Sequence, residues 1–296
     1  MTAVCTTPDE QPAIAVIPYA ERFPEGLSNL PLDRLDWPLG RPKRLIAGTV
    51  ADMTAHDHLI TYPKTSLYLA PKAKRRAQLS LMIVEPDVVH AKHLRLAKVF
   101  HRRFFRVLTK NRRLIASIPN ARLFVFGSTF IPEPDRVETR KTRPASLIAS
   151  AKRDWEGHRL RHLIVDHIRS SGLDVDIMGR GYRPFADKAD GLAPYRYSVV
   201  IENTREPSYF TEKLVDALLC NTVPIYWGAP DIAEFFDVSG MILCQTAADI
   251  QAALTHMSEA DYENRATAIA ENRRRAIHYA DLHGRAARAI HHDLTA

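Results

Sequence analysis

The densest group of side chains that could do chemistry lies in the run ENTREPSYFTEK, from Glu202 to Lys213. Asn203 offers an amide, and Glu212 offers a carboxylate that can accept two hydroxyls at once, as on a ribose or a sugar. Lys213 adds a full positive charge. These residue types together predict a site for a polyhydroxylated molecule that carries phosphate.

A strand before this run and a helix within it would position these side chains. Residues 197–201 form a short apolar run typical of a buried parallel strand, and α/β sheets bind ligands at the carboxyl ends of such strands. The apolar residues of TEKLVDALL share one helical face, so we expect a helix to begin between Ser208 and Thr211. Its unpaired N–H groups and positive dipole end favour a phosphate or pyrophosphate. VPIYW then predicts a second strand at residues 223–227.

The run ENTREPSYFTEK followed by VPIYWGAP resembles the nucleotide-sugar signature of the α-1,3/α-1,4-fucosyltransferases: E-N-S, a short gap, G-Y-V-T-E-K, then I-P-I-Y-W-G. Thr204 replaces the Ser and keeps a hydroxyl. Ser208 stands where Gly is usual, which could change the backbone of the loop because Gly reaches positive φ cheaply. The resemblance implies that the donor-binding residues include Glu202, Asn203, Thr204, Ser208, Tyr209, Thr211, Glu212 and Lys213.

An ordinary strand, helix and strand would explain each of these residues singly. In that interpretation Tyr209, Tyr226 and Trp227 are core residues, while Glu212 and Lys213 are solvated. It does not explain why the whole signature is present without a gap. Tyr195 and Trp227 could wall a pocket, but both are better explained as core.

Three cations upstream are further candidates for donor binding. SLIAS, at residues 146–150, predicts a strand, and GHRLRHLIVDHIRSS predicts the helix that follows it. Lys152, Arg159 and Arg161 lie just past the strand, where a guanidinium can bind a diphosphate bidentately. In the resembled family an Arg of the corresponding helix contacts the nucleotide phosphates, and Arg161 is the better candidate. Solvated cations on a basic helix are an equally good explanation.

Glu85 is the candidate catalytic residue. It ends the apolar run LSLMIVE and precedes Pro86, and partial burial at the end of a strand would raise the pKa of its carboxyl toward that of a general base. A surface carboxylate explains the pattern as well. The resemblance favours the base, because the family places its catalytic Glu after a similar strand, followed there by Asn.

Neither histidines nor paired aspartates predict a metal site. His90 and His93 have helical spacing, but no nearby carboxylate or Cys would complete a tetrahedral set. Asp174 and Asp176 are expected to be strand residues before a glycine turn. The predicted reaction therefore needs no metal and no cofactor beyond its donor substrate, GDP-fucose.

The composition predicts a globular protein, with 46% hydrophobic and 25% charged residues. Its net charge of +7 suits nucleic acid, an anionic membrane face or a nucleotide diphosphate. No RNA-binding motif is present, so we expect no nucleic-acid partner, while a peripheral membrane contact stays open. Cys5, Cys220 and Cys244 are scattered, which favours a reducing compartment. No signal peptide or transmembrane segment is expected, as in soluble bacterial relatives, and the expected location is cytoplasmic.

Strands alternating with helices predict an α/β fold. We expect an acceptor-side domain at residues 1–143 and a nucleotide-sugar domain at 144–296, each a doubly wound parallel sheet. The resemblance implies the same arrangement: two Rossmann-like domains with an interdomain cleft, the GT-B glycosyltransferase type. Residues 1–43 are expected to be a surface segment, and residues 44–50 and 66–70 are strand candidates. A long helix is expected from residue 258 to about 290.

The leading hypothesis is an inverting glycosyltransferase that moves fucose from GDP-fucose to a hydroxyl of an acceptor glycan, in an α-1,3-type linkage. Glu85 would act as the base, and Arg161, Lys213 and the helix start would stabilise the leaving diphosphate. Two alternatives are the same fold with another nucleotide sugar and a non-catalytic basic protein that binds a glycan or RNA. The acceptor and the oligomeric state are not predicted.

Overall fold

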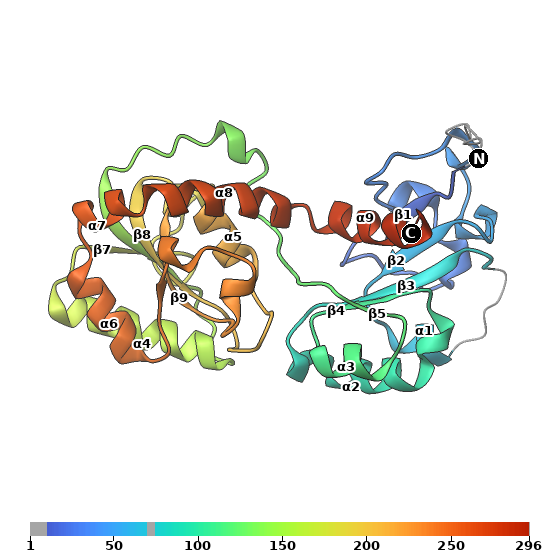
Figure 1. Cartoon of the computed structure of the whole chain (residues 1–296), viewed down its shortest axis with the longest axis horizontal. Helices are drawn as coiled ribbons and strands as arrows, with labels where there is room; N and C mark the ends of the chain where they lie inside the picture. The colour runs from blue at the N-terminus through green and yellow to red at the C-terminus, as the bar shows by residue number, and fades with distance from the viewer. Residues whose placement is uncertain (1–10, 70–74, 296) are drawn as a thin grey trace. The chain divides into compact units, whose positions relative to one another are not determined.

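The computed structural model describes residues 11–69 and 75–295 (Figure 1). The chain divides into two compact units: unit 1 consists of residues 1–125 and 282–296, and unit 2 consists of residues 126–281. This division differs from the predicted boundary at residue 143. Residues 126–142 belong to unit 2 because they are hydrogen-bonded to it: the Lys141 ammonium donates to the carbonyl oxygens of Ala193 and Cys220 at 2.8 and 2.7 Å.

Unit 1 is built on a five-stranded sheet in which every pairing is parallel and the strands lie side by side in chain order. The strands are β1 (Ile14–Val16), β2 (His58–Thr61), β3 (Gln78–Ile83), β4 (Val107–Thr109) and β5 (Ala121–Leu123). Because the order never reverses, this sheet is wound in one direction only, and the prediction of a doubly wound sheet was wrong for this unit.

Helices cover both faces of the unit 1 sheet (Figure 1). On one face lie α1 (Thr65–Leu69), α2 (Asp87–Phe100) and α3 (Arg112–Ser117). The other face is covered by α9 (Leu282–Thr295), the last helix of the chain, which packs against β1 and β2. The N-terminal unit is thus completed by the C-terminal segment.

The early part of unit 1 differs from the sequence prediction. Residues 11–43 are not a surface segment, because they contain β1 and bury Leu32 and Leu35 in the core. Residues 44–50 are not a strand, because 44, 45 and 50 belong to short 3-10 turns and the residues between them are bends and one isolated bridge at Thr49. Residues 66–69 belong to α1 rather than to a strand, and residue 70 is outside the described part. Leu45 and Tyr68 still pack into the core. The apolar pattern therefore predicted which residues are buried, but it did not predict their secondary structure.

Unit 2 is a second parallel sheet, with strand order β10-β9-β8-β6-β7. Its strands are β6 (Arg143–Ile148), β7 (Val175–Met178), β8 (Tyr195–Ile201), β9 (Val223–Trp227) and β10 (Ile242–Leu243). The chain runs outward from β6 to β7 and then in the opposite direction from β8 to β10. The predicted doubly wound sheet is confirmed here, and its point of reversal between β6 and β8 is where such sheets bind ligands.

Helices lie on both faces of this sheet (Figure 1). One face carries α4 (Glu156–Ser171) and α6 (Ala247–His256), and the other carries α5 (Glu212–Leu219) and α8 (Ala266–Ala280). The predicted long helix from residue 258 is three helices, since α7 (Glu259–Asn264) ends before Arg265 and α8 ends before Asp281. Within the described residues, no helix combines the length and the apolar character needed to cross a bilayer.

Candidate functional site

The carboxyl end of β8 and the start of α4 approach each other very closely. The Gly157 N–H donates to the carbonyl oxygen of Asn203 at 3.0 Å. A Cβ atom at position 157 would lie 1.8 Å from the carbonyl oxygen of Glu202, so no residue but glycine fits without a backbone shift. This contact holds the end of β8 and the start of α4 together at the reversal point of the sheet.

Arg161 links the same two elements from inside. Its side chain is buried, and its Nε and one terminal nitrogen donate to the carbonyl oxygen of Ile201 at 3.1 and 2.5 Å. The same terminal nitrogen also donates to Oδ1 of Asn203 at 3.0 Å. Burial lowers the pKa of this guanidinium, and the charge of Glu202 opposes that shift. The structure therefore brings Arg161 and Asn203 together, as expected for one site.

The other two predicted cations are outside this cluster. Arg159 is exposed, and its guanidinium donates to the carbonyl oxygen of Asp154 at 3.0 Å. The side chain of Lys152 is also exposed, while its backbone oxygen lies 3.0 Å from Nε2 of His162. The interpretation as solvated cations fits Arg159 and Lys152 better than it fits Arg161.

Thr211, the residue that caps α5, is hydrogen-bonded to a buried carboxylate of the protein. Glu202 is fully buried, and its two oxygens accept hydrogen bonds from the N–H and the hydroxyl of Thr211 at 2.8 and 2.7 Å. Burial raises the pKa of this carboxyl, and the nearby Lys213 opposes the shift. The donor-binding role expected for Glu202 and Thr211 stays a prediction, and in this structure the Thr211 donors and the Glu202 carboxylate are hydrogen-bonded to each other.

Ser208 adopts a left-handed backbone conformation, which glycine reaches more easily than serine does. Its φ of 56° lies in the left-handed region, and the residue is fully buried. Its N–H and its hydroxyl donate to the two carboxylate oxygens of Asp231 at 2.6 and 2.7 Å. Two charge-assisted hydrogen bonds therefore hold Ser208 in the left-handed conformation. Like Thr211, Ser208 has no donor left for a phosphate, and Tyr209 beside it is buried.

Three cations line a small cavity of about 20 Å³ at the reversal point: Arg161, Lys188 and Lys213. The Lys213 ammonium donates to Oγ1 of Thr211 and to Glu212, both at 3.0 Å. Burial acts to lower the pKa of Lys213, but the carboxylates of Glu202 and Glu212 raise it overall. Lys213 therefore stays charged.

Sequence reasoning missed Lys188, which precedes β8 in a short 3-10 turn. Burial lowers the pKa of its ammonium, and the carboxylates of Asp216 and Glu212 oppose that shift. Asp216, also missed, is fully buried on α5 and accepts from the Thr129 hydroxyl at 2.5 Å. Its Oδ2 has no hydrogen-bond partner within the described residues, and burial raises the pKa of this carboxyl to about 7. No periodic pattern marks either residue in the sequence.

Glu85 lies in unit 1, two residues beyond β3, where it is half-buried. Burial first, and the charge of Glu85 second, raise the pKa values of Tyr19 and Tyr62. The Tyr62 hydroxyl lies 3.1 Å from Nε2 of His283, and Nδ1 of His283 lies 2.7 Å from Oδ2 of Asp36. Glu85 thus shares the carboxyl edge of this sheet with a chain of hydrogen-bonding groups that the sequence analysis missed.

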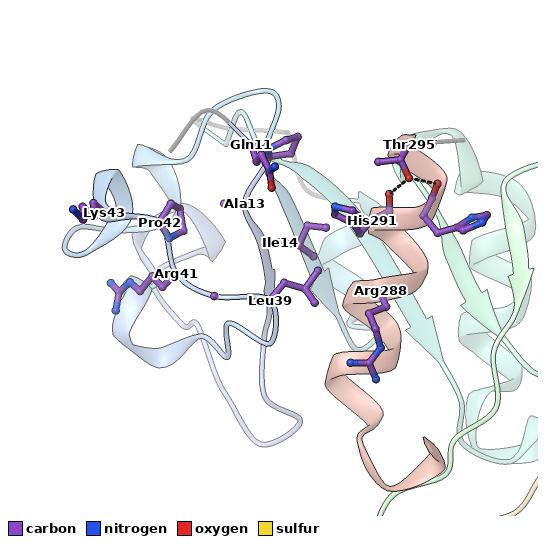
Figure 2. A pocket seen from close by; sticks show the side chains of 13 residues that line it. Gln11, Ala13, Ile14, Leu39, Arg41, Pro42, Lys43, Arg288, His291 and Thr295 are labelled. Atoms are coloured by element: carbon purple, nitrogen blue, oxygen red, sulfur yellow. Dashed lines mark hydrogen bonds between the residues drawn. The ribbon is translucent and has the colours of Figure 1, made fainter. Parts of the chain in front are cut away.

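A larger cavity of about 720 Å³ also belongs to unit 1 (Figure 2). It lies between the start of β1, residues 39–43 and α9, and Figure 2 shows Arg288 and His291 on its helical wall. All strands of this sheet are parallel, so the start of β1 lies at the edge opposite to Glu85. This cavity is therefore separate from the candidate base.

The histidines and aspartates considered for metal binding make packing contacts and hydrogen bonds within the protein or are exposed. Burial lowers the pKa of His90 to about 4, and its ring packs edge-on against His93 with 5.6 Å between the centroids. Asp176 accepts from the Tyr195 hydroxyl at 2.7 Å, whereas Asp174 is exposed. Across residues 11–69 and 75–295, no three His, Cys, Asp or Glu residues are grouped so as to hold a metal ion.

The two aromatic residues that could wall the pocket are core residues. Tyr195 and Trp227 are almost completely buried, and the Trp227 indole donates to the carbonyl oxygen of Gln245 at 3.0 Å. Trp227 packs in the core cluster of unit 2. The interpretation of both residues as core is confirmed.

Comparison with known proteins agrees with the resemblance seen in the sequence. Residues 139–268 match the sequence model of the C-terminal domain of glycosyltransferase family 10, the fucosyltransferases. The chain is 38% identical over 56 residues to the alpha-(1,3)-fucosyltransferase FucT of Helicobacter pylori, which covers 19% of this chain and 12% of that protein. It is 29% identical over 94 residues to alpha-(1,3)-fucosyltransferase B of Drosophila melanogaster, or 29% of this chain and 21% of that protein.

The matches thus span less than a quarter of the length of these two relatives. A crystal structure of an alpha1,3-fucosyltransferase with GDP is similar to this chain with a TM-score of 0.49 and 16% identity, covering 72% of this chain and 69% of that one. The match to the family model confirms the predicted resemblance over residues 139–268, which make up most of unit 2.

Proposed function

We propose that this protein transfers fucose from GDP-fucose to a hydroxyl of an acceptor glycan, with inversion and in an α-1,3-type linkage. The observation that carries the proposal is the convergence of Arg161, Lys188 and Lys213 on one cavity at the reversal point of the unit 2 sheet. The cavity of about 20 Å³ has room for about one water molecule, so the diphosphate would bind over it rather than inside it, against these three cations. This unit also matches the fucosyltransferase family, and the reversal point is where such sheets bind ligands.

The residues of the site take different parts in this proposal. Lys213, Lys188 and Arg161 neutralise the diphosphate. Asn203 and Glu212 bind hydroxyls of the ribose or the fucose. Thr204 joins them, because its hydroxyl oxygen is buried and has no hydrogen-bond partner within the described residues.

Four buried residues of the signature hold the site residues in place without contacting the donor. Glu202 and Thr211 fix the start of α5, and with it Lys213. Ser208 fixes the turn before it, and Tyr209 packs there as a buried residue. We assign these four a positioning role, so that the diphosphate is bound by side-chain cations rather than by the helix start.

In the proposed reaction Glu85 removes the proton of an acceptor hydroxyl as that oxygen forms a bond to the anomeric carbon of fucose. The bond from the anomeric carbon to the diphosphate breaks in the same displacement, which inverts the configuration. The negative charge that develops on the leaving GDP is stabilised by the three cations. We also propose a cytoplasmic location, which the buried free thiols of Cys220 and Cys244 support.

Thermal stability with GDP, GDP-fucose, UDP and UDP-glucose tests the donor, because a ligand that binds only the folded state raises the melting temperature. We expect a shift with the two guanosine ligands only. The Lys213→Met variant should lose that shift, whereas Lys92→Met, a matched change on the exposed surface of unit 1, should keep it. A shift confined to the uridine ligands would refute the proposed donor.

The Glu85→Gln variant tests the base separately. We expect GDP-fucose to raise its melting temperature as in the wild type, while transfer to a glycan acceptor falls by about 10²- to 10⁴-fold, the usual contribution of a general base. Transfer at the wild-type rate would refute the assigned role of Glu85 and leave the donor assignment untouched.

A further inference from the structure

The positive charge of this protein is concentrated in one segment. Residues 88–132 contain ten of the 41 Lys and Arg residues and none of the 34 Asp and Glu residues. The rest of the chain holds 31 cations and 34 anions, so it is slightly acidic. The basic character of the whole chain therefore comes from this segment, most of which belongs to α2, α3 and the strands beside them.

One side of α2 and of the 3-10 turn that follows it, His101–Arg103, presents much of this charge to solvent. Val88, Lys92, Arg95, Val99 and Arg102 are all exposed, and their spacing of four, three, four and three residues aligns them along one stripe, hereafter the α2 face. The opposite side of the helix is packed into unit 1 through Ala97 and His90, which are buried. The α2 face is therefore a stable outer surface of a folded helix.

The α2 face combines cations with large exposed apolar side chains. Val88 is 60% exposed and Val99 is 72% exposed, and Val89 on α2 and Leu69 on α1 are exposed as well. Two packed helices, α1 and α2, thus carry four of the large apolar side chains that reach solvent. A solvated helix face that served only solubility would not need them.

Carboxylates of the protein form ion pairs with other cations of residues 88–132, but not with the cations of the α2 face. Asp87 binds Lys110 at 2.7 Å, and Asp293 forms an ion pair with Arg106. Within the described residues, Lys92, Arg95 and Arg102 have no ion-pair partner, so their charge is available to an external anion.

We propose that the α2 face docks on an anionic membrane surface. Peripheral binding of this kind requires two contributions, apolar side chains that enter the interface and cations that attract acidic headgroups, and the stripe supplies both. A nucleic acid fits less well, because single strands need exposed aromatic rings for stacking. Phe104 is buried, and Phe100 and Phe105 are half-buried.

The position of the α2 face also bears on the acceptor. α2 begins at Asp87, two residues after Glu85, and Val88 follows directly. Taken with the proposed function, on which this step rests, the geometry points to an acceptor glycan that is itself held at the membrane surface. Docking and transfer are separate measurements, so the failure of one does not decide the other.

Co-sedimentation of the full chain with vesicles tests docking without any sugar donor. One set of vesicles contains phosphatidylcholine only, and the other contains about 30% phosphatidylglycerol. We expect binding to the anionic vesicles alone, weakened by salt. The double variant Lys92→Glu/Arg95→Glu should bind at least about 30-fold more weakly, since each cation near an anionic surface contributes about fivefold.

The matched control is Arg140→Glu/Arg180→Glu, which makes the same change in net charge at two exposed residues of unit 2. It should bind vesicles nearly as well as the wild type. The Val99→Ser variant should weaken vesicle binding although it leaves the charge unchanged, which a purely electrostatic contact would not predict.

Absence of binding, equal binding to both kinds of vesicle, or equal losses in the two charge variants would overturn the proposal. Tighter binding to single-stranded RNA than to vesicles, unaffected by Val99→Ser, would also overturn it in favour of a nucleic acid. Thermal shifts with GDP, recorded for each variant, report the donor site independently.

Discussion

Ser208 offers a sharp test of the loop geometry at the donor site. Its φ of 56° is strained for any residue with a Cβ, at roughly 1–2 kcal/mol. The strain is offset by the hydroxyl, which donates to the Asp231 carboxylate at 2.7 Å. Alanine and glycine at this position both remove the hydroxyl, but only glycine also removes the strain.

The difference between the two variants can be worked out from these contributions. Loss of a hydrogen bond to a charged group costs about 1.5–3 kcal/mol and applies to both. Glycine recovers the roughly 1–2 kcal/mol of strain. It also makes the unfolded chain more flexible, which costs about 0.5–1 kcal/mol. We therefore expect Ser208→Gly to be more stable than Ser208→Ala by roughly 0.5–1 kcal/mol, with both less stable than the wild type.

Urea denaturation of the three proteins measures the free energies of unfolding directly. Ser170, an exposed residue in the last turn of α4, supplies the control, because in a helix alanine is favoured over glycine, by up to about 1 kcal/mol, and the order of the two variants is reversed. If Ser208→Ala were as stable as Ser208→Gly, the left-handed conformation of this residue would be refuted.

Three further predictions concern the same unit. Lys188→Met should weaken GDP binding about 10- to 100-fold by calorimetry, as loss of a charge-assisted contact does, without lowering the melting temperature of the free protein; unchanged affinity would exclude Lys188 from the site. Gly157→Ala should cost at least about 1–3 kcal/mol in urea, because its Cβ would meet the backbone of Glu202, and wild-type stability would contradict that close approach. The raised pKa of Asp216 means that the folded state keeps a proton that the unfolded state releases, so stability should fall as pH rises from about 4 to about 7. Asp216→Asn should flatten this part of the profile, measured as melting temperature against pH, and an unchanged slope would contradict the assignment.

The second unit could be predicted because several patterns agree there. The apolar run at residues 197–201, the one-sided helix after Thr211 and the run VPIYW each have one reasonable interpretation, and together they require a parallel sheet. In unit 1, β1 and β2 have three and four residues, too few to show a period. Long connections supply much of that core, and burial alone does not distinguish a strand from a turn.

The candidate site was predictable only in part, for a similar reason. Asn203, Arg161 and Lys213 follow from their places at element ends. The partners that occupy the backbone donors of the loop, Glu202 for Thr211 and Asp231 for Ser208, depend on tertiary contacts. No spacing rule predicts that the Glu202 carboxylate will accept both hydrogen bonds of the residue that caps α5.

Because α9 packs in unit 1, this unit cannot complete its fold until the end of the chain has been synthesised. During synthesis, β1 and β2 emerge early, but the helix that packs against them is encoded after the whole of unit 2. Unit 2 is continuous and can fold as soon as it leaves the ribosome, whereas unit 1 must wait with one sheet face uncovered. A frameshift near residue 281 would therefore damage the N-terminal unit while sparing its neighbour, and holdase chaperones should bind nascent unit 1 rather than unit 2.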